Sequence, residues 1–100
     1  MDPVTAICNV CIEGFAAATK AARPGSPLAN ARAALGPDGY ADAACKAMRA
    51  HVLKALTEDT ERNLADLRVC GELAAKAIVT GVIADSIRDV IAAANVVQAA

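Results

Sequence analysis

The chain has 100 residues, of which 56% are apolar, and its net charge is −1. A chain of this length forms one domain, and its apolar content excludes intrinsic disorder. Ten basic residues against eleven acidic ones give no general attraction to nucleic acid or to an anionic membrane surface. The 26 alanines, with only one Phe and one Tyr, predict an Ala-rich, all-α domain over residues 1–100.

The N-terminal sequence and the number of cysteines indicate in which cellular compartment the protein is expected. No basic residue precedes the first apolar stretch, so we expect no secretory signal. Four cysteines are fewer than a disulfide scaffold of this size carries, which favours a reduced, cytoplasmic protein. Because four is an even number, a secreted bundle with two disulfides stays open as an alternative.

The first predicted helix begins at Asp2-Pro3, where Asp is a good N-cap and proline fits the first helical position. Proline and glycine in residues 24–27 end it near Arg23. Its apolar residues recur at helical spacing and form one face. They are Val4, Ile7, Cys8, Cys11, Ile12, Phe15 and Ala18.

Two further helices are predicted in the middle of the chain. Ser26-Pro27 repeats the cap-and-proline start, and Gly36-Pro37 closes this short helix after Leu35. The next helix covers about residues 40–56. Its apolar side consists of Ala41, Ala44, Cys45, Met48, Val52, Ala55 and Leu56.

The C-terminal part begins with a cap-like Thr57 followed by Glu58-Asp59. No proline follows as far as Val97, and an unbroken helix of that length would extend about 60 Å, which is too long for the domain. We therefore expect a break at residues 70–71 or 80–81. The whole chain is then a compact four- or five-helix bundle with closely packed helices.

Cys8 and Cys11 have the spacing of metal ligands, and Cys45 and Met48 repeat it on another predicted helix. Thiol and thioether sulfur suit Cu(I), and thiols also suit Zn, so a soft-metal site on the inner helix faces is one hypothesis. All four positions also follow the periodicity of the core. Buried structural thiols are therefore the simpler interpretation, and no cofactor is assigned.

Nothing in the sequence assembles a catalytic site. The single histidine, His51, lies at the edge of an apolar helix face, and the acidic residues 58–61 are explained by a helix start. Residues 77–91 loosely match a helix-turn-helix, but Asp85 and Asp89 would face the phosphates of DNA. We expect neither an enzyme nor a nucleic-acid-binding protein.

The last helix is apolar on two sides. One side carries Leu73, Val79, Ile83, Ile87, Val90, Ile91 and Ala94, and the other carries Ile78, Val82 and Val96, interrupted by Asp85 and Asp89. Such a helix is either central in the bundle or shared with another chain. The leading hypothesis is a non-enzymatic protein that binds a protein partner or a second copy of itself. It would act as an adaptor, an assembly subunit or a modulator of a larger complex. The partner-binding residues would then be Ile78, Val82, Asp85, Asp89 and Val96.

Overall fold

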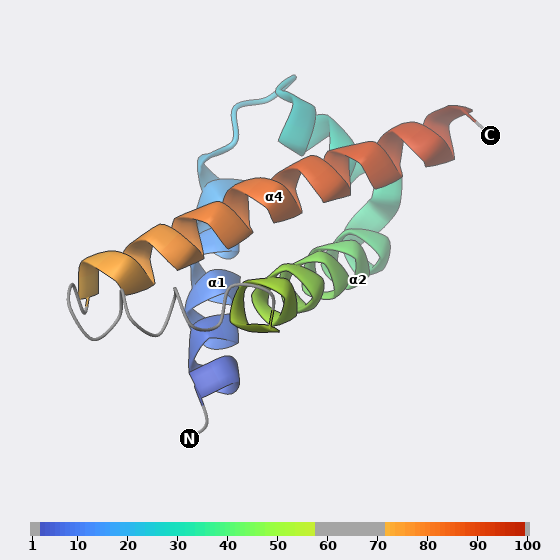
Figure 1. Cartoon of the computed structure of the whole chain (residues 1–100). Coiled ribbons are helices and arrows are strands. Elements are labelled where there is room, and N and C mark those ends of the chain that lie inside the picture. Colours follow the sequence, from blue (N-terminus) through green and yellow to red (C-terminus); the bar gives the residue numbers. More distant parts are fainter. Residues whose placement is uncertain (1–2, 58–71, 100) are drawn as a thin grey trace.

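A computed structural model describes residues 3–57 and 72–99 of the chain as three helices, with no strand in those two ranges (Figure 1). They are α1 (Pro3–Ala21), α2 (Pro27–Thr57) and α4 (Glu72–Ala99). The predicted all-α class is confirmed. Within residues 3–57 and 72–99 there are three helices and not the four or five predicted for the chain, because the two predicted helices on either side of Gly36 join as the kinked α2 and the predicted break at residues 80–81 is absent.

The link between α1 and α2 follows the predicted cap chemistry. α1 ends two residues before the expected Arg23, and the amide of Ala22 donates to the carbonyl of Thr19 at 3.3 Å. The hydroxyl of Ser26 then accepts a hydrogen bond from the amide of Ala29 at 3.3 Å. Ser26 is therefore the N-cap of α2, and Pro27 is its first residue.

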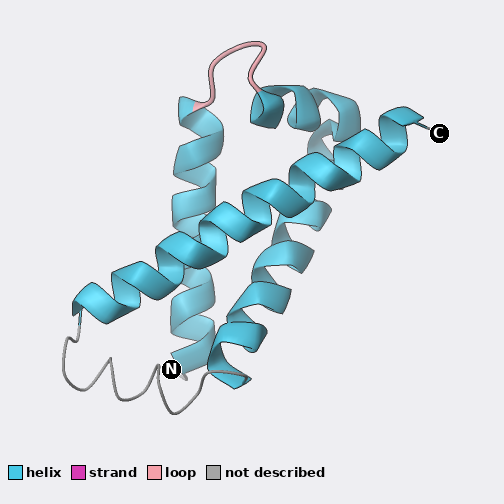
Figure 2. Ribbon diagram, turned by 45° about the horizontal axis from the view of Figure 1, so that its top comes forward, coloured by secondary structure: helices cyan, strands magenta, loops and turns pink. Residues whose placement is uncertain are grey.

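Gly36 is the corner of α2. Its φ of 74° and ψ of 168° are non-helical, yet the helix resumes at once with Pro37, whose missing amide hydrogen costs nothing in a first turn. The first arm (residues 27–35) and the second arm (residues 37–57) consequently run in different directions (Figure 2). The sequence predicted these arms as separate helices joined by a turn, whereas one residue is enough to turn the chain.

α4 is a single helix without the predicted break at Thr80-Gly81. Gly81 stays helical at a cost of about 1 kcal/mol relative to alanine, which the packing of the helix offsets. The 28 residues of α4 extend roughly 42 Å, close to the longest dimension of the molecule, 44 Å. Thr57 ends α2, and its hydroxyl donates to the carbonyl of Leu53 at 2.7 Å, whereas the helix expected to begin there lies outside the described residues. The other expected break, at residues 70–71, and the acidic residues 58–61 lie outside the described residues.

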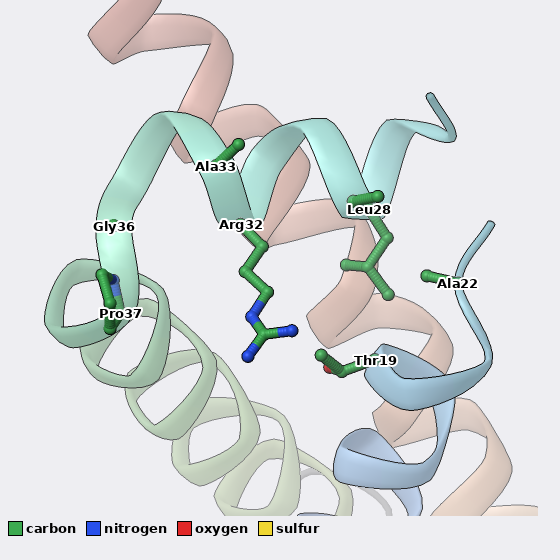
Figure 3. A pocket seen from close by; sticks show the side chains of 8 residues that line it. Thr19, Ala22, Leu28, Arg32, Ala33, Gly36 and Pro37 are labelled. Atoms are coloured by element: carbon green, nitrogen blue, oxygen red, sulfur yellow. The ribbon is translucent and has the colours of Figure 1, made fainter. Parts of the chain in front are cut away.

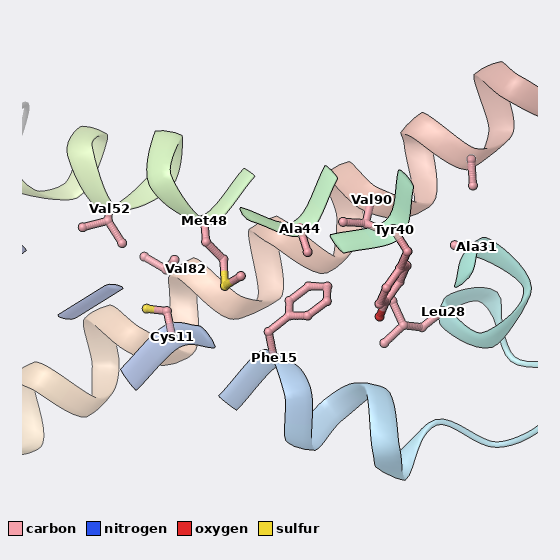
Figure 4. Packing of buried hydrophobic residues seen from close by; sticks show 11 residues of the cluster. Cys11, Phe15, Leu28, Ala31, Tyr40, Ala44, Met48, Val52, Val82 and Val90 are labelled. Carbon is pink, nitrogen blue, oxygen red and sulfur yellow. The ribbon is translucent and has the colours of Figure 1, made fainter. Parts of the chain in front are cut away.

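The core lies where α4 crosses both α1 and the second arm of α2, and α4 contacts both helices (Figure 2). Phe15 and Tyr40 face each other there, with ring centroids 5.8 Å apart (Figure 4). The Tyr40 hydroxyl lies 2.5 Å from Thr19 Oγ1, which in turn donates to the Phe15 carbonyl at 3.0 Å. The buried apolar residues are Cys11, Phe15, Leu28, Ala31, Tyr40, Ala44, Ala47, Met48, Val52, Val82, Val90 and Ala94.

α1 and α4 approach each other closely at Gly14. A Cβ atom at this position would clash with Cδ1 of Ile83. Because Gly14 has no side chain, the Ile83 side chain can pack directly against α1 at this position.

Ser86, on α4, places its hydroxyl group in the apolar core of the protein. It is fully buried, and its Oγ has no hydrogen-bond partner among the described residues. An unsatisfied buried polar group costs about 1–3 kcal/mol. We expect Ser86→Ala to raise the free energy of unfolding by about 1 kcal/mol, measured by urea denaturation followed by circular dichroism.

Ser26→Ala is the matched control for that substitution. The Ser26 hydroxyl caps α2, so its loss should lower the free energy of unfolding by about 1 kcal/mol. The two serine-to-alanine changes should therefore have opposite signs. A destabilising Ser86→Ala would show that the Ser86 hydroxyl has a partner after all.

Candidate functional site: a groove between two helices

A groove of about 690 Å³ lies between α1 and the second arm of α2. Side chains spaced three or four residues apart lie on the same face of a helix, and this spacing aligns the residues of both walls. α1 contributes Cys8 and Ile12, and α2 contributes Cys45, Lys46, Met48, Arg49, Ala50 and Leu53.

The groove combines apolar walls with positive charge. Ile12 is 46% exposed and Leu53 is 45% exposed, both high values for large aliphatic side chains. Lys46 and Arg49 are exposed, and no acidic residue lines the groove. Its lining therefore carries two positive charges next to accessible apolar surface.

Sequence periodicity placed Ile12 on the inner apolar face of its helix, whereas the structure leaves it 46% exposed in the groove. Leu53 belonged to no predicted apolar face, and that isolation on a polar side was the one signal that could have marked it.

The groove also gathers three of the four sulfur side chains that the sequence proposed as metal ligands. Cys8 and Met48 line it together with the exposed Cys45. Cys11 does not line it, because it is fully buried in the core (Figure 4). Burial raises the pKa of the Cys11 thiol, and the neighbouring Cys8 raises it further, so Cys11 keeps its proton at neutral pH.

The described cysteines are free thiols. Two disulfides among four cysteines would require a bond between two of Cys8, Cys11 and Cys45, and the structure has none. Cys70 lies outside the described residues. Within residues 3–57 and 72–99, no three side chains of His, Cys, Asp and Glu are grouped to hold a metal ion.

A second polar cluster joins α2 to α4 at the surface. His51 Nε2 lies 2.6 Å from Asp89 Oδ2, and His51 Nδ1 lies 4.0 Å from Asp85 Oδ2. Arg88 forms an ion pair with Asp85. Both carboxylates, expected on a partner-binding side, thus have partners within the chain.

The other proposed partner-binding residues of α4 do not share one surface. Val82 is buried in the core, and Ile78 is partly buried against it, whereas Val96 is 70% exposed. α4 contacts both α1 and α2. These two contacts explain why α4 is apolar on two sides.

Two further hollows lie elsewhere on the described surface. One, of about 390 Å³, lies beside Gly36, and the Arg32 guanidinium extends into it between Thr19 and Pro37 (Figure 3). The other, of about 650 Å³, lies between the first arm of α2 and the end of α4. Neither combines accessible large apolar side chains with several charges.

No protein-family model matches the chain, and comparisons with curated proteins and with solved structures find no match. Among the described residues, no helix has both the length and the hydropathy needed to cross a membrane.

Proposed function

We propose that this chain is a non-enzymatic helical protein that binds an amphipathic helical segment of a partner protein in the groove between α1 and α2. It would serve as an adaptor, an assembly subunit or a modulator of a larger complex. The observation that carries the proposal is the pairing of accessible Ile12 and Leu53 with Lys46 and Arg49 in one groove.

The apolar part of the argument concerns shape. A helix that enters a groove inserts side chains at positions three and four residues apart. Ile12 on one wall and Leu53 on the other offer apolar contacts on both sides, with Met48 buried beside them. Covering these side chains removes apolar area from water at about 25 cal/mol per Å².

The charges indicate what flanks the apolar face of the partner. Lys46 and Arg49 line the groove without a lining carboxylate, so acidic residues at the edge of the incoming helix would pair with them. A second copy of this chain is a weaker candidate. The acidic residues Asp85 and Asp89 of its α4 are already paired with Arg88 and His51.

The test is capture of a partner from lysate of the source cells by the tagged chain and its variants. Leu53→Asp introduces a negative charge into the apolar part of the groove. The double variant Lys46→Glu/Arg49→Glu replaces the two positive charges of the lining with negative ones. All three positions are exposed, so the fold should persist, which circular dichroism checks. Each variant should lose the partner that the wild type retains, and binding should weaken with salt.

Val96→Asp is the matched control, because Val96 is exposed near the far end of α4 and lines no part of the groove. It should retain the partner. A partner lost with Val96→Asp but kept by the groove variants would overturn the groove proposal in favour of α4. Light scattering during size exclusion should show a monomer, and a dimer dissociated by Leu53→Asp would identify a second copy as the occupant.

A further inference from the structure

Three sulfur side chains from two helices line the groove together. Cys8 comes from α1, and Cys45 and Met48 come from the second arm of α2. From this juxtaposition we propose that the groove binds one Cu(I) ion through the thiols of Cys8 and Cys45 and the thioether of Met48. This proposal does not rest on the proposed protein partner, although both would use the same groove.

The arrangement of the two helices favours such a site. Cys45 and Met48 are three residues apart and therefore neighbours on one helix face. Cys8 lines the same groove from the opposite wall. Cys45 is exposed, Cys8 is half-buried and Met48 is buried, so an ion entering from solvent meets thiols before it reaches the thioether.

The chemistry of the ligands selects the metal. Thiolate and thioether are soft ligands that suit Cu(I), whereas structural zinc takes four nitrogen or sulfur ligands in a tetrahedron. Among the described residues, no three side chains of His, Cys, Asp and Glu are grouped to hold a metal ion, so the groove lining does not itself supply the four ligands of structural zinc. Cu(I) accepts a low coordination number, and the thioether of Met48 adds to the two thiols.

Charge favours a monovalent ion as well. Binding exchanges the two thiol protons for one Cu⁺ and releases both protons to solvent, so the bound site carries one net negative charge. Lys46 and Arg49 line the same groove and stabilise that negative charge. No oxidation or reduction of the protein is involved.

Cys11 provides an internal control. It is three residues from Cys8 but fully buried and outside the groove lining, and burial raises the pKa of its thiol. If the spacing of Cys8 and Cys11 in sequence formed the site, Cys11 would be required. If the groove forms it, Cys11 is dispensable.

The experiment titrates reduced protein with Cu(I) under anaerobic conditions against bicinchoninate, a coloured Cu(I) chelator. Cys70→Ala serves as the common background, so that only the three described thiols remain. One Cu(I) per chain should be retained. Cys8→Ala and Cys45→Ala should each weaken Cu(I) binding at least about tenfold. Loss of a residue that only orients a metal ligand already lowers affinity by about that factor, and these substitutions remove a ligand itself. Met48→Leu, which conserves volume, should weaken it less, and Cys11→Ala should leave it unchanged.

A second measurement uses the chain with Cys70 present. Bound Cu(I) should slow alkylation of Cys8 and Cys45 by iodoacetamide, located by mass spectrometry. The proposal is overturned if no copper is retained against the chelator, if binding survives both Cys8→Ala and Cys45→Ala, or if Cys11→Ala abolishes it. Leu53→Asp removes neither a sulfur ligand nor a positive charge of the groove, so loss of the protein partner and loss of copper are separable outcomes.

Discussion

Replacing Phe15 with alanine is expected to lower the free energy of unfolding by about 3–5 kcal/mol. The Phe15 ring is 3% exposed and lies in the core that α1, α2 and α4 share (Figure 4). Its removal deletes the contact with the Tyr40 ring and leaves a cavity that small neighbours do not fill. Because domains of this size are stable by only about 5–15 kcal/mol, Phe15→Ala should unfold in much less urea than the wild type.

Ile12→Ala is the control for the loss of Phe15. It also truncates a large apolar residue of α1, but Ile12 is 46% exposed and lines the groove. Its cost should stay near or below about 1 kcal/mol, as for most surface substitutions. Equal effects of the two changes, by urea denaturation, would place Phe15 outside the core.

The helix starts were predictable because they depend on local chemistry. Ser26-Pro27 carries its own cap and its own fixed φ, and α2 begins there. Pro3 is likewise the first residue of α1. The missing break at Gly81 shows the limit of such signals, because a weak local preference yields when a helix packs against two neighbours.

The core was predictable only in part. Met48 and Val52 are buried as expected, but Cys45 on the same predicted face is exposed. Periodicity identifies an apolar stripe, whereas the crossing of helices decides which part of it is covered. On α1, Cys11 is fully buried, whereas the next residue, Ile12, is 46% exposed.

The groove lies beyond sequence reasoning for the same reason. Its walls belong to helices whose separation and crossing the sequence leaves open. The sulfur side chains of these walls could be proposed as ligands from the sequence, because their three-residue spacing places them on one face of a predicted helix. That Cys8, Cys45 and Met48 share a groove while Cys11 does not depends on tertiary packing.

Gly36→Ala is expected to lower the free energy of unfolding by about 1–3 kcal/mol. At φ 74° and ψ 168° the backbone occupies a region that is open almost only to glycine. A Cβ here would meet nothing within 4 Å, so the cost comes from the backbone and not from a clash. A helical conformation gives no relief, because Pro37 disfavours it for the residue before it. Urea denaturation measures the loss.

Gly81→Ala separates this backbone effect from the general effect of replacing a glycine. Gly81 is helical and exposed, and its Cβ would also meet nothing within 4 Å. Alanine there should raise the free energy of unfolding by about 1 kcal/mol through helix propensity alone. The same substitution should thus destabilise the corner of α2 and stabilise α4. A neutral or stabilising Gly36→Ala would mean that α2 passes this corner in an ordinary conformation, without the change of direction that places its two arms around α4.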